Sequence, residues 1–253
     1  MKLFRTPEGK AIEYIRVSTL AAYWYCSMKS LLQALGIESP SNEATNVGTK
    51  VHNDITAARP STELEKELER FLKDFMINHD SGEGSTGLQG TENKVFARAW
   101  KINDETVGYI VSHGFDDFRV YPDKSVVIVE YKTTNQTVID WYKLSTAIFQ
   151  LRVYCWMLEP LLKAGGYSIK KAEIVYLKQP SKKGKAEQLP PHMIEPIGIK
   201  TIDYDEKTVE EDIRKIFKEY GNPSHMVAPA RYKCYSCHPN FKSRCLFQGV
   251  PQH

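Results

Sequence analysis

The feature that most restricts the fold of this chain is a run of four aliphatic residues, Val126–Val129, that ends in opposite charges at Glu130 and Lys132. An uninterrupted apolar run is typical of a strand buried on both faces, at the centre of a sheet covered by helices. Residues two apart on a strand point to the same face, so Glu130 and Lys132 share one. Because an isolated buried charge is costly, this pair needs partners or a place at the edge of the sheet.

The segments around this run alternate between helical and strand-like patterns. Leu64, Leu68 and Leu72 recur at helical spacing, and Cys155 lies in a long apolar helical pattern, where we expect it in the core. This order of elements predicts an α/β fold built on one mixed sheet, with a cysteine-rich tail as an appendage. The expected helices are 18–35, 43–58, 61–78, 140–163 and 205–220, the strands are 92–102, 106–112, 115–120, 125–133, 172–178 and about 193–200, and turns are expected at 103–104 and 122–123.

The composition excludes several classes of protein. With 42% hydrophobic and 26% charged residues, the chain of 253 residues is neither disordered nor fibrous. It contains no apolar run near the ~18–20 residues that span a bilayer, and its first ten residues lack the apolar segment of a secretory signal. We therefore expect a cytoplasmic protein without membrane contact. The net charge of +3 permits an acidic partner such as nucleic acid without requiring one.

A second acidic residue is placed to meet the charged end of the apolar strand. Asp117 lies 13 residues before Glu130, a spacing that suits the neighbouring strands of a hairpin. Two carboxylates brought together repel each other unless a cation lies between them, and oxygen ligands alone favour Mg²⁺ or Mn²⁺. Lys132 would then stand beside the metal, where it could orient or activate water or neutralise a transition state. The alternative is a strand-end salt bridge between Glu130 and Lys132 without catalytic function.

Three further polar residues are candidates for the same site. His52 belongs to the expected helix 43–58, and histidine is the commonest metal-binding side chain. Taken alone, however, His52 is more often a surface or core histidine. Gln150 and Tyr154 lie one helical turn apart on the expected helix 140–163, and alone they indicate only a polar flank of that helix.

The remaining cysteines are unevenly placed. Cys234 and Cys237 form a C-x₂-C pair, Cys245 follows closely, and Cys26 lies far upstream. In a reducing compartment, clustered cysteines more often hold a metal than form disulfides. An all-cysteine tetrad suits Zn²⁺ or a [4Fe–4S] cluster. The alternative is a local zinc knuckle in which His238 replaces Cys26.

These motifs fall in the order seen in RecB-like nucleases of the PD-(D/E)XK superfamily, which the chain resembles from about residue 17 to residue 246. The iron–sulfur branch, the CRISPR-associated Cas-four exonucleases and their relatives, is the most similar. Each motif is weak singly, whereas all six in one order are a specific combination. They are Val17-Ser18-Thr19-Leu20 with Tyr25-Cys26, Gly48-x₃-His52, Gly114-x₂-Asp117, Glu130-Tyr131-Lys132-Thr133-Thr134, Gln150-x₃-Tyr154 and the three tail cysteines.

The resemblance implies a single nuclease domain over residues 1–253, with a restriction-endonuclease-like core, a central mixed sheet flanked by helices, at 43–220. Segments 17–36 and 228–248 would hold an iron–sulfur cluster that joins the N-terminal helix to the C-terminal tail. The implied cofactors are Mg²⁺ or Mn²⁺ and [4Fe–4S]. The implied metal ligands are His52, Asp117, Glu130 and the Tyr131 carbonyl; the catalytic residues are Lys132, Glu130, Asp117, Gln150 and Tyr154; and the cluster ligands are Cys26, Cys234, Cys237 and Cys245.

The implied activity is metal-assisted hydrolysis of phosphodiester bonds in DNA, by an exonuclease that prefers single strands or single-stranded ends. The nuclease would act in CRISPR spacer acquisition, together with an integrase complex. The other settings are DNA repair, recombination, or a role as a phage or viral protein. The rival interpretation is a non-catalytic module that binds nucleic acid or protein and has a zinc-knuckle tail. Candidate phosphate contacts are Lys178, Lys182, Lys183, Lys185, Arg231, Lys233, Lys242 and Arg244, and candidate base-stacking residues are Trp141, Tyr142 and Tyr154. The alternatives are an ordinary solvated surface for the basic residues and a place in the core for Trp141 and Tyr142.

The chain departs from the family pattern in its tail. Seven residues, 238–244, separate the last two cysteines, where the family usually has five. Two acidic residues also compete for a place in the site. Asp116 is adjacent to Asp117, and the Gly-x-x-Asp pattern favours Asp117 as the ligand. Glu92 occupies a position on the preceding strand where related nucleases often carry an acidic residue.

Overall fold

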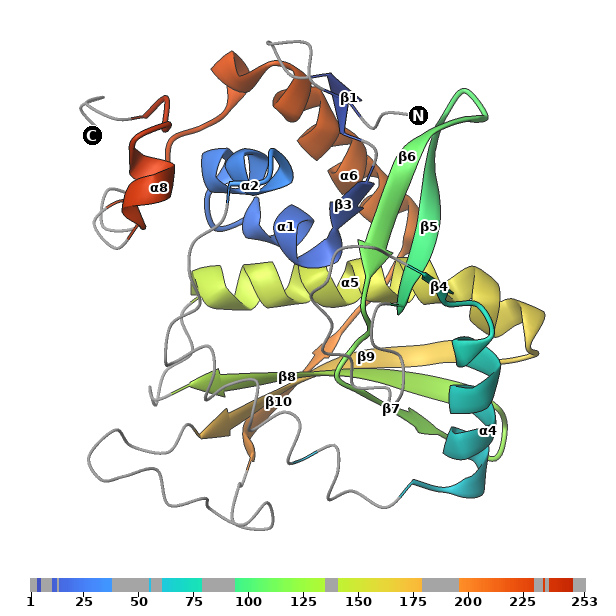
Figure 1. The fold of residues 1–253 in the computed structure, drawn as a ribbon. Helices are drawn as coiled ribbons and strands as arrows, with labels where there is room; N and C mark the ends of the chain where they lie inside the picture. The colour runs from blue at the N-terminus through green and yellow to red at the C-terminus, as the bar shows by residue number, and fades with distance from the viewer. Residues whose placement is uncertain are drawn as a thin grey trace. The chain divides into compact units, whose positions relative to one another are not determined.

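The computed structural model describes residues 4–5, 11–12, 14–37, 55, 61–78, 94–134, 141–178, 196–229, 234 and 237–247. The expected helix 43–58 with His52, and Glu92 on the preceding strand, lie outside the described residues apart from Ile55. In the described part, no helix is both long and apolar enough to cross a membrane. The chain is an α/β protein with mixed sheets and flanking helices (Figure 1).

The chain divides into two compact units. Unit 1 comprises Met1–Pro40, Ala97–Ser112 and Asp205–His253, and unit 2 comprises Ser41–Phe96 and His113–Tyr204. The candidate nuclease residues Asp117 to Tyr154 belong to unit 2, and the four candidate cluster cysteines belong to unit 1. We therefore describe the two units separately.

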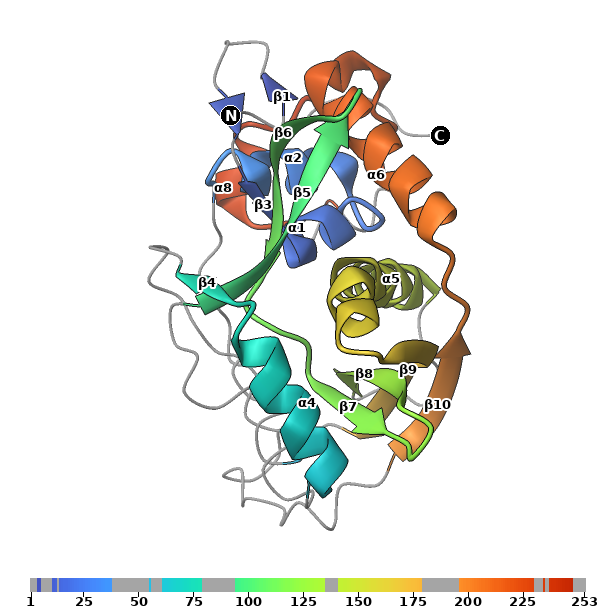
Figure 2. The same ribbon diagram turned by 90° about the vertical axis from the view of Figure 1, so that its right-hand side faces the viewer.

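Unit 2 is built around a four-stranded mixed sheet in the order β10-β9-β8-β7. β8 pairs antiparallel with β7 and parallel with β9, and β10 pairs antiparallel with β9. The parallel pair β8 and β9 is joined by the long helix α5, which lies over one face of the sheet (Figure 2). The bounds are β7 Asp117–Val120, β8 Ser125–Thr134, α5 Trp141–Ala164, β9 Ser168–Lys178 and β10 Pro196–Ile202.

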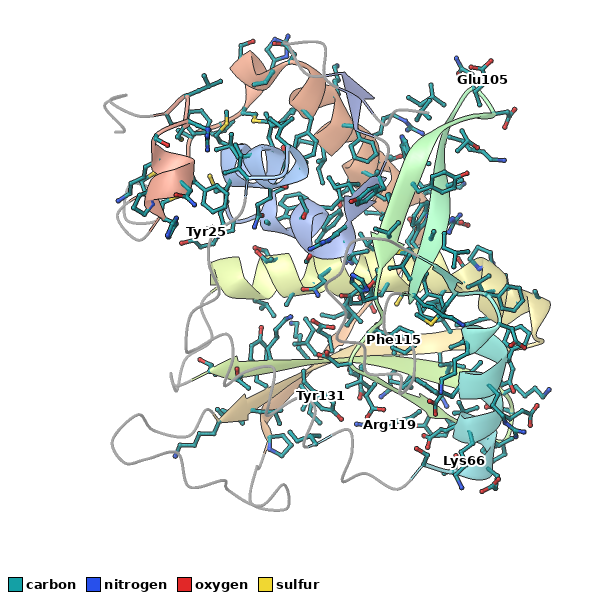
Figure 3. All side chains as sticks on the ribbon, viewed as in Figure 1. Tyr25, Lys66, Glu105, Phe115, Arg119 and Tyr131 are labelled. Atoms are coloured by element: carbon teal, nitrogen blue, oxygen red, sulfur yellow. The ribbon has the colours of Figure 1, made fainter. Side chains whose placement is uncertain are left out.

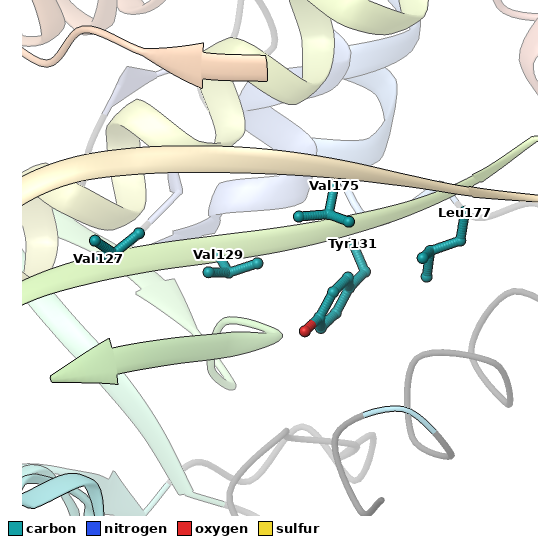
Figure 4. Packing of buried hydrophobic residues seen from close by; sticks show 5 residues of the cluster. All are labelled: Val127, Val129, Tyr131, Val175 and Leu177. Carbon is teal, nitrogen blue, oxygen red and sulfur yellow. The ribbon is translucent and has the colours of Figure 1, made fainter. Parts of the chain in front are cut away.

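The strand β8 is buried along most of its length, as its apolar run predicts. The side chains that point away from α5 form one compact cluster, in which Val127, Val129 and Tyr131 pack against Val175 and Leu177 of β9 (Figure 4). The positions between them face α5. Alternation along the two strands therefore assigns each side chain to one of two separate faces.

The long helix continues past a proline. Pro160 lies inside α5, four residues before its end at Ala164. Pro160 lacks the N–H that would bond the preceding turn, so continued packing of the apolar helix must offset that loss. After Ala164 the chain turns at Gly166, whose φ of 76° is easily adopted by glycine, and the Tyr167 N–H donates to the Leu162 carbonyl oxygen at 2.8 Å.

Unit 2 also contains a helix that is shorter than the sequence predicts. The apolar spacing suggested 61–78, but α4 covers Glu63–Lys73, and β4 follows at Ile77–Asn78. The helix begins with a capping box, in which the Thr62 side chain accepts from the Glu65 N–H and the Glu65 carboxylate accepts from the Thr62 N–H. β4 pairs antiparallel with the first residues of β5 (Lys94–Ile102).

Unit 1 contains a hairpin and several helices. β5 turns into β6 (Glu105–Ser112) at Asn103 and Asp104, whose positive φ values of 49° and 64° suit a tight hairpin turn. β3 (Tyr14–Arg16) adds to β6 in parallel. The other elements of this unit are β1 Phe4–Arg5, β2 Ala11–Ile12, α1 Val17–Ala22, α2 Ser27–Ala34, α6 Glu206–Gly221, the 3₁₀ helix η2 Pro223–His225 and α8 Pro239–Lys242.

The single helix that we expected at 18–35 is wrong, because the chain breaks it into α1 and α2. Residues 23–25 turn, and Cys26 is extended, with φ of −160°, as the N-cap of α2. Both helices are held to α6 by polar contacts. The Ser30 and Tyr220 hydroxyls form a buried hydrogen bond, and the Tyr23 hydroxyl donates to the Glu219 carboxylate at 2.7 Å. The break therefore leaves the Cys26 thiol at the start of a helix.

Candidate functional site

The charged end of β8 is linked to α5 by a chain of hydrogen bonds. The Lys132 ammonium donates to the Glu130 carboxylate and to Gln150 Oε1, the latter at 3.2 Å. Gln150 Nε2 in turn donates to the Tyr154 hydroxyl at 2.8 Å. Four of the residues singled out in the sequence, from two different elements, therefore lie together on the α5 face of the sheet.

The Glu130–Lys132 pair is largely withdrawn from water. Glu130 is only 2% exposed, whereas the Lys132 side chain is 31% exposed, so the ammonium lies at the border of the interior. Burial by itself lowers the pKa of Lys132, but the negative charges of Glu130 and Asp116 outweigh it and the pKa is raised. The lysine is thus a cation held between acidic groups.

The two neighbouring aspartates have different surroundings. Asp117 is opposite Val129 in the hairpin, so it shares the face of Val129 and Tyr131 rather than that of Glu130. Its Oδ2 accepts from the Tyr131 hydroxyl at 2.9 Å, and its Oδ1 accepts from the Phe118 N–H at 2.8 Å. These contacts direct Asp117 away from Lys132. Tyr131, the partner of Asp117, is labelled in Figure 3, as is Phe115, which directly precedes Asp116 in the chain.

Asp116 is the aspartate whose charge acts on Lys132. Its Oδ2 accepts from the Tyr131 N–H at 2.7 Å, at the edge where β7 begins. Its negative charge contributes to the raised pKa of Lys132, after that of Glu130. The described geometry therefore groups Asp116, rather than Asp117, with Glu130 and Lys132. His52 is not among the described residues, so its place in this group stays a prediction.

One residue near Lys132 was not among the candidates identified from the sequence. Tyr176 of β9 is paired in register with Lys132, so its side chain lies on the same face of the sheet. The signal was available in the alternation of β9, where Val175 and Leu177 belong to the other face. It could be used only once the pairing of β8 with β9 was known.

The structure describes only some of the residues that we expect to contact DNA. Tyr154 is 7% exposed and its hydroxyl is bonded to Gln150, so our expectation that it stacks on a base is wrong for this arrangement. Lys178, Lys242 and Arg244 are exposed, as a phosphate contact requires. The other expected contacts lie outside the described residues: Lys182, Lys183, Lys185, Arg231 and Lys233, together with the side chains of Trp141 and Tyr142.

In unit 1, three of the candidate cluster cysteines act electrostatically on the fourth, Cys26. Burial raises the pKa of Cys26, and the charges of Cys245, Cys237 and Cys234 raise it further. Cys26 Sγ also accepts from the Lys29 N–H, at 3.5 Å, as the cap of α2. Residues from the two ends of the chain thus bring their thiols into one region of this unit.

Lys29 supplies a positive charge to the same region. Burial raises the pKa of Cys237, and the charges of Cys245 and Cys234 act in the same direction, whereas the Lys29 ammonium lowers it. That ammonium lies 5.5 Å from the centre of the Phe241 ring in α8. The Lys29 charge therefore offsets part of the effect of burial on Cys237, whose pKa is still raised.

No three His, Cys, Asp or Glu side chains in the described ranges are arranged as a ready metal site. His238, which replaces Cys26 in the zinc-knuckle alternative, caps α8, its Nδ1 accepting from the Asn240 N–H at 3.2 Å; this alternative stays a prediction. Cys155 is fully buried, as expected, and burial raises its pKa to about 12. Cys155 is therefore a core residue of α5, whereas the other four cysteines are partly exposed.

Several solved structures are similar to this chain. SSO0001 matches with 16% identity and a TM-score of 0.48, covering 94% of this chain and 88% of that one. A Eubacterium rectale protein assigned as an exonuclease matches with 12% identity and a TM-score of 0.40, covering 89% of each chain. A phage-related exonuclease from Haemophilus somnus matches with 14% identity and a TM-score of 0.31, covering 82% of this chain and 92% of that one.

Membership of a family comes from the sequence itself. No curated protein matches the chain significantly. The sequence profile of the PD-(D/E)XK nuclease superfamily, however, matches residues 15–246, which include the acidic pair at the start of β7, the charged end of β8 and the cysteines of unit 1. Nucleases of this superfamily typically use divalent metals such as Mg²⁺ and Mn²⁺. The chain belongs to the PD-(D/E)XK nuclease superfamily.

Proposed function

We propose that this protein is a deoxyribonuclease that depends on Mg²⁺ or Mn²⁺ and hydrolyses phosphodiester bonds. The observation that carries the proposal is the group at the end of β8, where Glu130 and Lys132 meet Gln150 and Tyr154 of α5. A carboxylate, an ammonium group and an amide on one face provide a metal ligand, a positive charge and a polar contact for a phosphate.

The donors in this group suit a hard divalent cation. Glu130 and Asp116 offer carboxylate oxygens close to a single positive charge, that of Lys132, and oxygen donors are preferred by Mg²⁺ and Mn²⁺. We propose His52, Glu130, the Tyr131 carbonyl and one aspartate of the 116–117 pair as ligands. The described contacts favour Asp116, in place of the Asp117 that the Gly-x-x-Asp pattern favours. When bound, the ion would lower the pKa of water and neutralise charge on the phosphate.

The neighbouring side chains have separate tasks in this proposal. The Lys132 ammonium stabilises negative charge that develops on the phosphate. Gln150 holds that ammonium from the α5 side, and Tyr154 fixes the Gln150 amide through its hydroxyl. Because Glu130 is buried, its carboxylate is held in one place by the surrounding sheet rather than by water.

A labelled-oligonucleotide assay tests the proposed function. We expect purified protein to degrade DNA with Mn²⁺ or Mg²⁺ and to leave it intact with EDTA, and we expect single strands or single-stranded ends to be degraded faster than blunt duplexes. A protein that binds DNA but never cuts it would support the rival interpretation, because a non-catalytic module could have the same Glu130–Lys132 salt bridge.

The biological setting is part of the same proposal and rests on the resemblance alone. We propose that the nuclease trims DNA for CRISPR spacer acquisition, or processes ends in repair and recombination. Recovery of an integrase-type partner with the tagged protein from its own host would support the first setting. Recovery of the tagged protein without an integrase-type partner, from cells deficient in end processing, would support the second setting, repair and recombination.

We also propose that Cys26, Cys234, Cys237 and Cys245 hold a [4Fe–4S] cluster. The support is the electrostatic effect of Cys234, Cys237 and Cys245 on the Cys26 thiol, since clustered thiolates repel one another unless a cationic centre lies between them. A cluster ligated by Cys26 and three tail cysteines would link distant parts of the chain. It would stabilise unit 1 in the manner of a long-range cross-link.

Replacing Cys234 by alanine should remove this cluster. We expect anaerobically purified protein to be brown and to contain about four iron atoms per chain, and we expect the variant to be colourless and less soluble. The matched control is Cys155→Ala, which removes a buried thiol of α5 and should retain the iron. Elemental analysis that finds zinc and no iron in the unaltered protein would contradict the cluster.

A further inference from the structure

Tyr176 has a buried hydroxyl for which the structure provides no hydrogen-bond partner. The residue is 3% exposed, and its oxygen is unpartnered within the described part of the chain. Buried tyrosine hydroxyls usually find a partner, as those of Tyr131, Tyr167 and Tyr220 do here. An unsatisfied hydroxyl in the interior lowers stability, so its retention calls for a reason outside the resting fold.

The surroundings of this hydroxyl suggest the reason. Tyr176 is in register with Lys132 on the adjacent strand, on the face covered by α5. Burial raises the pKa of the Tyr176 hydroxyl, and the nearby Lys132 ammonium partly opposes that rise. Lys132 is therefore a strong donor on the same face as this hydroxyl, and in the resting structure it donates to Glu130 and Gln150 instead.

Metal binding would change the partners of Lys132. In the proposed function, on which this inference rests, Glu130 would help to hold the cation, and its carboxylate would then be less available to accept from the Lys132 ammonium. We propose that Tyr176 is a positioning residue, whose hydroxyl oxygen accepts a hydrogen bond from Lys132 when Glu130 binds the divalent ion. The hydroxyl thus keeps the ammonium on the α5 face, beside the phosphate.

This role predicts that Tyr176→Phe slows turnover without lowering stability. Without metal, loss of an unpartnered buried hydroxyl should leave the melting temperature unchanged or higher. With saturating Mn²⁺, kcat should fall about tenfold, because the ammonium loses an acceptor. KM should be unchanged, because the substitution does not affect substrate binding. The matched control is Tyr167→Phe, whose hydroxyl donates to Glu67 at 3.2 Å; it should lower the melting temperature and leave kcat unchanged.

Thermal shifts provide a readout that does not depend on cleavage. We expect Mn²⁺ to raise the melting temperature of Tyr176→Phe by less than that of the unaltered protein. In a Lys132→Met background, the Tyr176 substitution should no longer change the Mn²⁺ shift, because the donor is gone. A lower melting temperature for metal-free Tyr176→Phe, or an unaltered kcat and Mn²⁺ shift, would overturn the positioning role.

The same measurements separate this inference from the proposed function. If the unaltered protein shows neither cleavage nor a Mn²⁺ shift, the proposed function itself fails. If the unaltered protein cleaves and shifts while Tyr176→Phe behaves identically in both assays, only the role of Tyr176 fails.

Discussion

Replacing Lys132 by methionine should reduce DNA cleavage by about 10²–10³-fold while the protein stays folded, because the change removes one positive charge from the site and keeps most of the side-chain volume. The ammonium connects Glu130 to Gln150, so both residues also lose a fixed partner. Glu130→Gln should cause a loss of at least the same size, because it removes a buried carboxylate proposed to bind the metal. Single-turnover cleavage of a labelled oligonucleotide with saturating Mn²⁺ measures both effects.

The same sheet offers a matched control for the lysine substitution. Lys171 of β9 pairs with buried Glu173 at 2.6 Å, on the face opposite to Lys132. Lys171→Met therefore breaks a similar ion pair in the same sheet without touching the proposed site. We expect it to lower the melting temperature and to leave the cleavage rate unchanged. Full activity in both Lys132→Met and Glu130→Gln would show that the end of β8 is not the catalytic site.

The two adjacent aspartates should respond differently to the same substitution. Asp116→Asn should lower cleavage by about 10²-fold with little loss of stability, because Asp116 is partly exposed and its charge acts on Lys132. Asp117→Asn should mainly lower the free energy of unfolding, by about 1–3 kcal/mol, because it weakens a buried carboxylate that accepts from the Tyr131 hydroxyl and the Phe118 N–H. Cleavage rates and urea unfolding of both variants measure the contrast.

Tyr131→Phe tests the structural assignment of Asp117. It removes the hydroxyl that donates to Asp117 and leaves the main chain of Tyr131 in place. The stability losses of Tyr131→Phe and Asp117→Asn should be less than additive, since both disrupt one hydrogen bond. The opposite result, an inactive Asp117→Asn beside an active Asp116→Asn, would restore Asp117 as the metal ligand and require the start of β7 to rearrange on metal binding.

The order of elements in unit 2 was predictable from local patterns. The apolar run before Glu130 identified the central strand, and a helical pattern after it identified α5. Both signals are local, because burial on two faces excludes polar residues from a strand and a buried helix needs an extended apolar surface. The end of α4 was not predictable in this way, because the apolar pattern continues past Lys73 while the chain turns into β4.

The assignment of the aspartate shows the limit of spacing arguments. Counting residues from Asp117 to Glu130 placed both carboxylates at neighbouring strand ends, which the hairpin confirms in outline. It did not decide the faces, because a shift of one residue in register moves a side chain to the other side of a sheet. The observed pairing of Asp117 with Val129 puts Asp117 beside Tyr131 and leaves Asp116 to act on Lys132.

The amino-acid sequence by itself determined the superfamily, the buried strand with its charged end, and the helix that carries Gln150 and Tyr154. These features depend on residue type and periodicity, which act between close neighbours in the chain. Only the tertiary structure decided the break before Cys26, the face occupied by each aspartate and the place of Tyr176 beside Lys132. Those features depend on strand register and on packing between distant segments, and no local pattern contains that information.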